Sequence, residues 1–227
     1  ASAGAPEPGR MSPYGTLALA LAASYLLGAV PFAWVLVRVW TGKDLRREGS
    51  GNIGATNAIR AAGRPVGILA FLPDAAKGLV PVLWFGPLAS GAADGALAPW
   101  MAVAAGAAAV AGHCFPIYLG FRGGKGVATG CGALLGLDWR IFAIGGAVWL
   151  AVLFATRYVG LASILMGVTF PVAAGILLGP VHPAVFGAAA LFLLILVRHR
   201  SNMARMLAGT EPKAFRSRGA RANGGSA

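Results

Sequence analysis

Long apolar runs separated by short polar stretches make up most of this chain. The runs cover Tyr14–Val39, Val66–Leu88, Leu97–Leu119, Val127–Leu137, Ile141–Thr156, Leu161–Leu178 and Pro183–Val197. A helix of about 20 apolar residues spans a bilayer, so the pattern predicts an all-α integral membrane protein with seven transmembrane helices. The fourth run would form a helix of only ~16 Å. We therefore expect the polar residues before it to lie below the membrane surface, in a protein-lined cavity.

The basic residues indicate how these helices are oriented. With seven spans, nearly all of the 19 Lys and Arg residues fall on one side of the membrane, while Arg10 and Arg140 fall on the other and Lys77 lies within a span. Cytoplasmic loops carry an excess of Lys and Arg. The N-terminus is therefore predicted outside and the C-terminus in the cytoplasm. The chain then divides into an N-terminal tail over 1–13, a membrane domain over 14–200 and a basic C-terminal tail over 201–227.

Composition agrees with a membrane protein and narrows its partners. Hydrophobic residues make up 57% of the chain and charged residues 11%, against about 25% charged residues in soluble domains. The net charge of +12 is not gathered in one block, and no nucleic-acid recognition motif accompanies it, so we expect no nucleic-acid partner. Cys114 and Cys131 are too few for a disulfide framework or a metal site. We expect two buried thiols, no metal and no cofactor.

Three polar segments interrupt the apolar pattern, and the predicted topology places all three on the cytoplasmic side. Gly49–Arg60 combines glycines with Ser, Asn and Thr side chains and an arginine, Gly112–Thr129 places glycines and a lysine before a helix start, and Arg198–Asn202 follows the last span. Taken singly, they could be a polar loop, a snorkelling lysine and a topology anchor. Together they suggest one pocket for a substrate that carries a phosphate and an apolar tail.

In this order and spacing, the three segments closely resemble those of the bacterial acyl-phosphate:glycerol-3-phosphate acyltransferases, the PlsY family. The resemblance covers about Tyr14 to Lys213. It implies seven helices in the bacterial inner membrane and a cytoplasm-facing active site. It also implies transfer of a fatty acyl group from acyl phosphate to the 1-hydroxyl of glycerol 3-phosphate, which yields lysophosphatidic acid and phosphate as the first step of phospholipid synthesis. The implied partners are glycerol 3-phosphate, acyl phosphate and membrane lipid.

The resemblance and the polar inventory of the first segment suggest site residues. The candidate catalytic residues are Ser50, Lys125, His199 and Asn202. The candidate substrate-binding residues are Gly51, Asn52, Thr56, Asn57, Arg60, His113, Gly123, Gly124, Gly126 and Ser163. His113 could equally be a packing histidine. Where many family members have a serine after the Arg-Tyr-Val of residues 157–159, this chain has Gly160, which puts a role at that position in doubt.

Direct transfer without an acyl-enzyme is the expected chemistry. An acyl phosphate is already activated, so the protein must chiefly position it beside the alcohol and stabilise charge. Lys125 and the glycine N–H groups would hold the acyl phosphate, and either His199 or the substrate's own phosphate would act as base. Asp74 and Lys77, three residues apart within a span, could pair on one helix face. The competing functions are a transporter for organic phosphates and a lipid-binding scaffold.

Overall fold

The computed structural model describes residues 12–92 and 97–214, and every regular element there is a helix or a helical turn. The first half contains α1 (Pro13–Ala29), α2 (Phe32–Thr41), α3 (Ala55–Ala62), α4 (Arg64–Val80), the π-helical turn Pro81–Phe85 and α5 (Gly86–Ala92). The second half contains α6 (Ala98–Cys114), α7 (Val127–Leu137), α8 (Trp139–Thr156), α9 (Val159–Leu178), α10 (Pro183–Arg198) and α11 (Arg200–Leu207). Short 3-10 turns lie at Leu45–Arg47 and Ile117–Leu119. The predicted tails over 1–11 and 215–227 lie outside the described residues.

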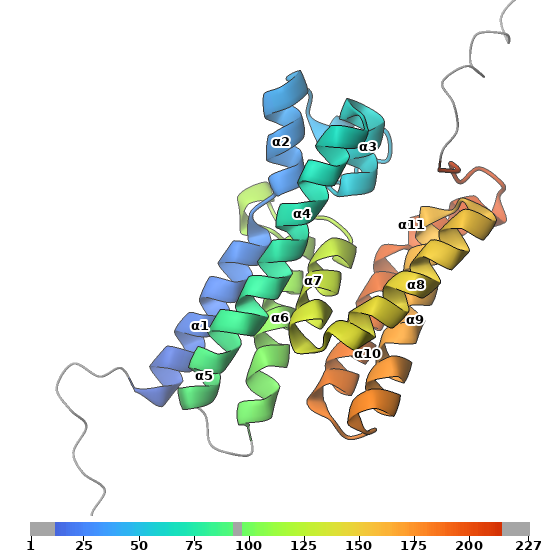
Figure 1. The fold of residues 1–227 in the computed structure, drawn as a ribbon. Coiled ribbons are helices and arrows are strands. Elements are labelled where there is room, and N and C mark those ends of the chain that lie inside the picture. The colour runs from blue at the N-terminus through green and yellow to red at the C-terminus, as the bar shows by residue number, and fades with distance from the viewer. Residues whose placement is uncertain (1–11, 93–96, 215–227) are drawn as a thin grey trace, which may run out of the picture.

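The helices form two groups that meet along α6, α7 and α10 (Figure 1). In the first group α1 packs on α6 and α4 packs on α7, and in the second α9 packs on both α8 and α10. Helices α2 and α3 of the first group and α11 of the second lie toward the same end of the molecule, opposite the end where α1 and α6 begin (Figure 1). The chain thus gathers its polar connections at the end that carries α3 and α11.

Glycines let the helices of the first group approach closely. A Cβ at Gly78 of α4 would collide with the carbonyl oxygen of Thr129 on α7, and a Cβ at Gly132 of α7 would collide with that of Ala75. Small residues at such contacts allow membrane helices to pack backbone against backbone. The glycine content of the sequence therefore has a structural purpose between α4 and α7.

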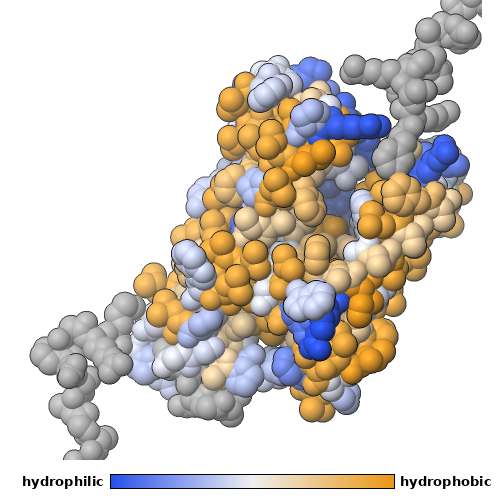
Figure 2. All heavy atoms as spheres, viewed as in Figure 1, coloured by the Kyte–Doolittle hydropathy of each residue, from blue (hydrophilic) through white to orange (hydrophobic). Residues whose placement is uncertain are grey.

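The membrane spans agree with the sequence prediction in most places. Five helical stretches within the described residues are long and apolar enough to cross a bilayer, and the bent α10–α11 pair gives a sixth. The first predicted run is broken at Val30 and Pro31, because proline lacks the N–H that would continue α1. Helix α7 has 11 residues, as expected from its short run. Hydrophobic residues cover most of the face seen in Figure 2, and hydrophilic ones gather near α3, α8 and α11.

The segment assigned to the basic tail begins with ordered structure. Helix α11 follows α10 after a bend of 52°. Beyond it, the side chain of Glu211, which lies in the predicted tail over 201–227, is buried. The reason is a hydrogen-bond network that no local pattern in the sequence reveals.

Candidate functional site

The first polar segment is organised by Asn57, which lies on α3 and is buried. Its Nδ2 donates to the carbonyl oxygens of Leu45, Glu48 and Asn52 at 3.2, 2.9 and 2.9 Å. Its Oδ1 accepts the N–H of Ser50 at 3.1 Å. The amide group therefore closes the loop from inside, with both its donor and its acceptor ends engaged. Asn57, predicted to bind substrate, shapes the loop that presents Ser50.

The other predicted residues of this segment surround that loop. Ser50 and Gly51 are exposed, and Gly51 has a φ of 70°, a conformation that favours glycine. Thr56 is half-buried at the start of α3, and Arg60 is exposed near its end. The Oδ1 atom of Asn52 is buried, with no hydrogen-bond partner among the residues that the structure describes. Ser50 and Arg60 are thus the exposed polar side chains of this segment that a ligand can reach.

The loop between α6 and α7 carries the predicted glycine pair Gly123 and Gly124. The N–H of Gly123 donates to the carbonyl of Cys114 at 3.2 Å, and that of Gly124 donates to the carbonyl of His113 at 3.0 Å. These bonds tie the loop to the end of α6. They correct the expectation that the two glycine N–H groups are free to hold a phosphate, because both are already used by backbone carbonyls.

Two side chains fix the glycine pair. Arg198 donates from Nη2 to the carbonyls of Gly123 and Gly124 at 2.8 and 2.6 Å, and from Nε to the latter at 3.0 Å. Its guanidinium carbon lies 5.5 Å from the ring centroid of Phe115, a cation–π distance. The imidazole of His113 lies against the α-carbon of Gly124 so closely that a Cβ there would collide with Nε2. His113 thus supports the loop from within the protein.

Helix α7 begins directly behind this loop. Gly126 immediately precedes it with a φ of 80°, which favours glycine. The N–H groups in the first turn of a helix have no intrahelical partner, and the helix dipole makes that end attractive to anions. The start of α7, with Lys125 beside it, therefore has free backbone N–H groups that can bind a phosphate. The N–H groups of Gly123 and Gly124 cannot do so, because they are already bonded.

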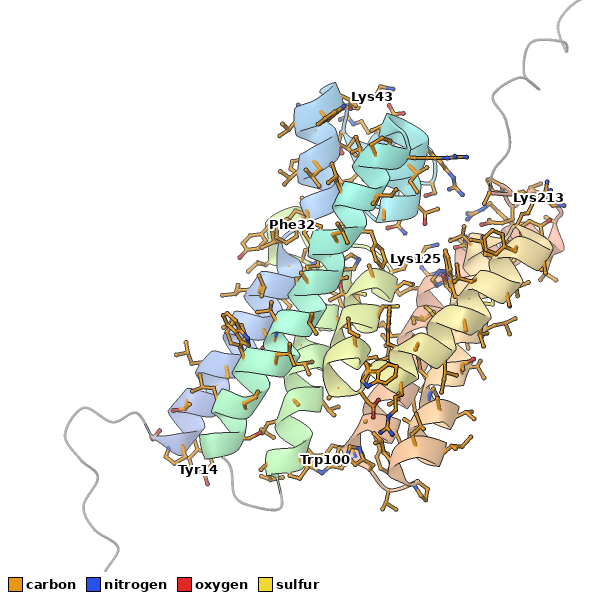
Figure 3. The ribbon with its side chains drawn as sticks, in the orientation of Figure 1. Tyr14, Phe32, Lys43, Trp100, Lys125 and Lys213 are labelled. Carbon is orange, nitrogen blue, oxygen red and sulfur yellow. The ribbon has the colours of Figure 1, made fainter. Side chains whose placement is uncertain are left out.

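Lys125, which is labelled in Figure 3, joins the second polar segment to the third. Its Nζ donates to Oδ1 of Asn202 on α11. Asn202 in turn donates from Nδ2 to Oε1 of Glu211 at 2.6 Å, and Oε2 of Glu211 accepts from Nε of Arg205 at 2.7 Å. Asn202 and Glu211 are both buried. The result is a continuous polar chain that orients the lysine and the asparagine.

The surroundings of Lys125 lower the pKa of its ammonium group. Burial lowers the pKa of this lysine to about 8, and the positive charges of Arg205, Arg60 and Arg198 act in the same direction. The carboxylate of Glu211 opposes them and raises the pKa. In this cluster the positive charges outnumber the single buried carboxylate. The excess of positive charge favours the binding of an anion such as phosphate.

His199 lies at the bend between α10 and α11 and is buried. Its Nδ1 is 2.8 Å from the carbonyl oxygen of Ile195. A carbonyl oxygen only accepts, so Nδ1 carries the hydrogen and donates it. In the neutral ring, Nε2 then has a lone pair that can accept a proton or a hydrogen bond.

Position 160 and Ser163 lie on α9. Gly160 lies against Asn202, and a Cβ there would come within 3.0 Å of the asparagine side chain. The hydroxyl of Ser163 donates to the carbonyl of Val159 at 2.9 Å and accepts from Nε1 of Trp149 at 3.2 Å. Ser163, predicted to bind substrate, therefore bonds α9 to α8, whereas the backbone at Gly160 borders the polar chain.

The structure brings the second and third predicted segments into direct contact, and Arg60 of the first adds its charge to the same cluster. Glu211 and Arg205 were missed as site residues, as was the specific role of Arg198. Glu211 could have been noticed in the sequence, because it is a single carboxylate in a strongly basic stretch. Figure 2 shows hydrophilic residues in a recess between the part of the molecule that carries α3 and α4 and the part that carries α8 and α11.

Comparison with known proteins covers nearly the whole chain. A family model described as glycerol-3-phosphate acyltransferase matches residues 18–209. A glycerol-3-phosphate acyltransferase of Mesorhizobium japonicum is 42% identical over 200 residues, which cover 88% of this chain and 96% of that protein. One from Anaeromyxobacter sp. (strain K) is 43% identical over 205 residues, covering 89% and 100%.

Two solved structures share the fold. The glycerol 3-phosphate form of PlsY (YgiH), an integral membrane glycerol 3-phosphate acyltransferase, matches with a TM-score of 0.79 and 37% identity, covering 88% of this chain and 96% of that one. The lysophosphatidic acid form matches with a TM-score of 0.77 and 35% identity, covering 88% and 95%. The similarity therefore extends to the three-dimensional arrangement of the helices.

Proposed function

Because this chain belongs to the glycerol-3-phosphate acyltransferase family, we propose that it transfers a fatty acyl group from acyl phosphate directly to the 1-hydroxyl of glycerol 3-phosphate in a bacterial inner membrane. The products would be lysophosphatidic acid and inorganic phosphate. The observation that carries this proposal is the contact between Lys125 and Asn202, which joins two cationic segments beside the start of α7.

The two substrates use different parts of the site in this proposal. The ammonium of Lys125 and the first N–H groups of α7 hold the phosphate of the acyl donor. Arg60 and Ser50, on the first segment, hold glycerol 3-phosphate. Asn202 fixes the lysine, and Nε2 of His199 faces the acceptor hydroxyl. Each group is a donor or an acceptor of the kind that its partner requires.

The transfer itself needs only positioning and charge stabilisation. The 1-hydroxyl oxygen attacks the acyl carbon, so an ester bond forms as the bond from that carbon to the bridging phosphate oxygen breaks. The electron pair of the broken bond leaves with the phosphate, whose charge Lys125 neutralises. The hydroxyl proton passes to Nε2 of His199 or to a phosphate oxygen. No bond between the acyl group and the protein is formed.

The same proposal includes seven membrane-inserted segments with the N-terminus outside and the site facing the cytoplasm. The bent α10–α11 pair and the short α7 would be inserted together with the five longer stretches. The irregular loop before α7 would then lie at membrane depth within protein, where such backbone is tolerated.

The purified full-length protein in detergent provides the test. With acyl phosphate and glycerol 3-phosphate, we expect both lysophosphatidic acid and free phosphate, and no product when acyl-CoA replaces the acyl phosphate. Failure with acyl phosphates of several chain lengths would contradict the proposed function. A radiolabelled acyl group that stays on the protein after denaturation would contradict direct transfer alone.

A further inference from the structure

A charged pair lies buried in α4 and is not part of the hydrogen-bonded chain of Lys125, Asn202 and Glu211. The side chains of Asp74 and Lys77 are each almost fully buried, and Nζ lies 2.8 Å from Oδ1. Desolvation of two charges is costly, and replacing such a pair by apolar residues of similar volume is often neutral or stabilising. A contribution to stability is therefore a weak explanation for the presence of this buried pair. The other contacts of Asp74 and Lys77 provide a stronger explanation.

Lys77 also holds the break between α1 and α2. Its Nζ donates to the carbonyl of Val30 at 2.8 Å, and it lies 5.8 Å from the ring centroid of Phe32. The carbonyl of Val30 belongs to the short turn that separates the two helices. Helix α2 packs on α4 and α3 and leads into Gly49–Arg60. A lysine fixed at this turn therefore sets the direction in which the first polar segment leaves the bundle.

Asp74 faces the support of the second polar segment. Its Oδ1, which is paired with Lys77, also lies 3.8 Å from Nδ1 of His113, and Nδ1 has no hydrogen-bond partner among the described residues. The carbonyl of His113 accepts the N–H of Gly124, and its ring lies against the α-carbon of that glycine. The carboxylate thus lies beside the ring that supports the loop leading to Lys125.

We propose that the Asp74–Lys77 pair is a positioning unit that fixes the two phosphate-binding segments relative to each other, through Val30 on one side and His113 on the other. Neither residue contacts substrate. The proposal rests on the proposed function, because it assumes that the two segments bind the two reactants. A small displacement of one reactant from the other lowers the rate of transfer without unfolding the protein.

The decisive variant is Asp74→Leu/Lys77→Met, which removes both charges together and leaves no unpaired ion. Its kinetic constants, its thermal unfolding temperature and the increase in that temperature produced by glycerol 3-phosphate are measured on full-length protein in detergent. We expect a kcat at least about 10-fold lower than that of the parent and an unfolding temperature close to that of the parent. Glycerol 3-phosphate should raise the unfolding temperature of the variant less than it raises that of the parent. Arg140→Gln, which breaks the ion pair between an exposed arginine and Asp138 at the start of α8, is the matched control and should change none of these.

A second variant, Asp74→Asn/Lys77→Gln, keeps polar groups that can form hydrogen bonds at both positions without the charges, although the side chain at position 77 becomes shorter. It should retain more activity than the apolar pair, and it decides the question if the apolar pair does not fold. Normal kcat and a normal response to glycerol 3-phosphate in the folded variants would overturn the positioning role. An inactive parent protein would instead contradict the proposed function, and the thermal response would still test the pair.

Discussion

At the scale of single residues, the site depends on which polar atoms are already used within the protein. Asn57 and Ser163 have their polar groups engaged in loop closure and helix packing. Lys125 differs, because its partner Asn202 uses only part of its donor capacity. The ammonium group therefore remains able to bind a phosphate while the asparagine keeps it in place.

Replacement of Lys125 tests this role. Lys125→Met keeps an unbranched side chain but removes the charge, so we expect kcat/KM to fall on the order of 100-fold. Phosphate release measures the effect, and the unfolding temperature should change little. Lys43→Met, at an exposed lysine beyond α2, is the control and should behave like the parent. A normal kcat/KM for Lys125→Met would exclude the lysine from the reaction.

The pKa of Lys125 predicts a pH dependence. Its pKa is lowered to about 8, so the ammonium is present below that pH and is lost as the pH rises through it. The kcat/KM profile, which reports the free enzyme, should therefore decline above about pH 8. Stability should change in the opposite direction, because the unfolded chain binds this proton more tightly and folding is favoured as the proton is lost. A Lys125→Arg variant that keeps some activity should lack the alkaline decline.

At the scale of elements, the loop between α6 and α7 is held by groups distant in the sequence. Arg198 at the end of α10 binds its carbonyls, and His113 of α6 lies beneath Gly124. The start of α7 is thus fixed by two other helices, which explains how a short helix keeps Lys125 in place.

A methyl group at position 124 should disturb this arrangement. In Gly124→Ala the new Cβ collides with the His113 ring, so the loop must move, and we expect kcat to fall at least about 10-fold. Gly175→Ala on α9 is the matched control, because its Cβ would meet nothing within 4 Å. Equal activity of both variants would show that the close contact at Gly124 has no part in catalysis.

At the scale of the whole molecule, the polar segments lie at one end of an apolar bundle. Figures 1 and 2 show α3 and α11 near the same end, with a mostly hydrophobic surface between it and the opposite end. A transporter would require matching polar access from both sides. The one-ended arrangement and the family membership favour an enzyme that takes a soluble substrate from one compartment and a lipid-like one from the membrane.

The proposed orientation can be measured by cysteine labelling. The native thiols of Cys114 and Cys131 are buried, so they should contribute little background. With a membrane-impermeant maleimide on intact cells, Trp139→Cys at the start of α8 should be labelled, whereas Lys43→Cys should react only after permeabilisation. The reverse pattern would contradict a cytoplasmic site.

The apolar runs, the asymmetry of the basic residues and the spacing of three polar segments were enough to predict the membrane class, most helix positions and the family. These features are local or periodic, so they can be recognised without knowledge of how the helices pack. The uses of Asn57, of the glycine N–H groups and of Glu211 required the tertiary structure. A polar side chain binds substrate or protein according to which partners the fold brings within hydrogen-bond distance, and Lys125 and Asn202 meet across 77 positions of the chain.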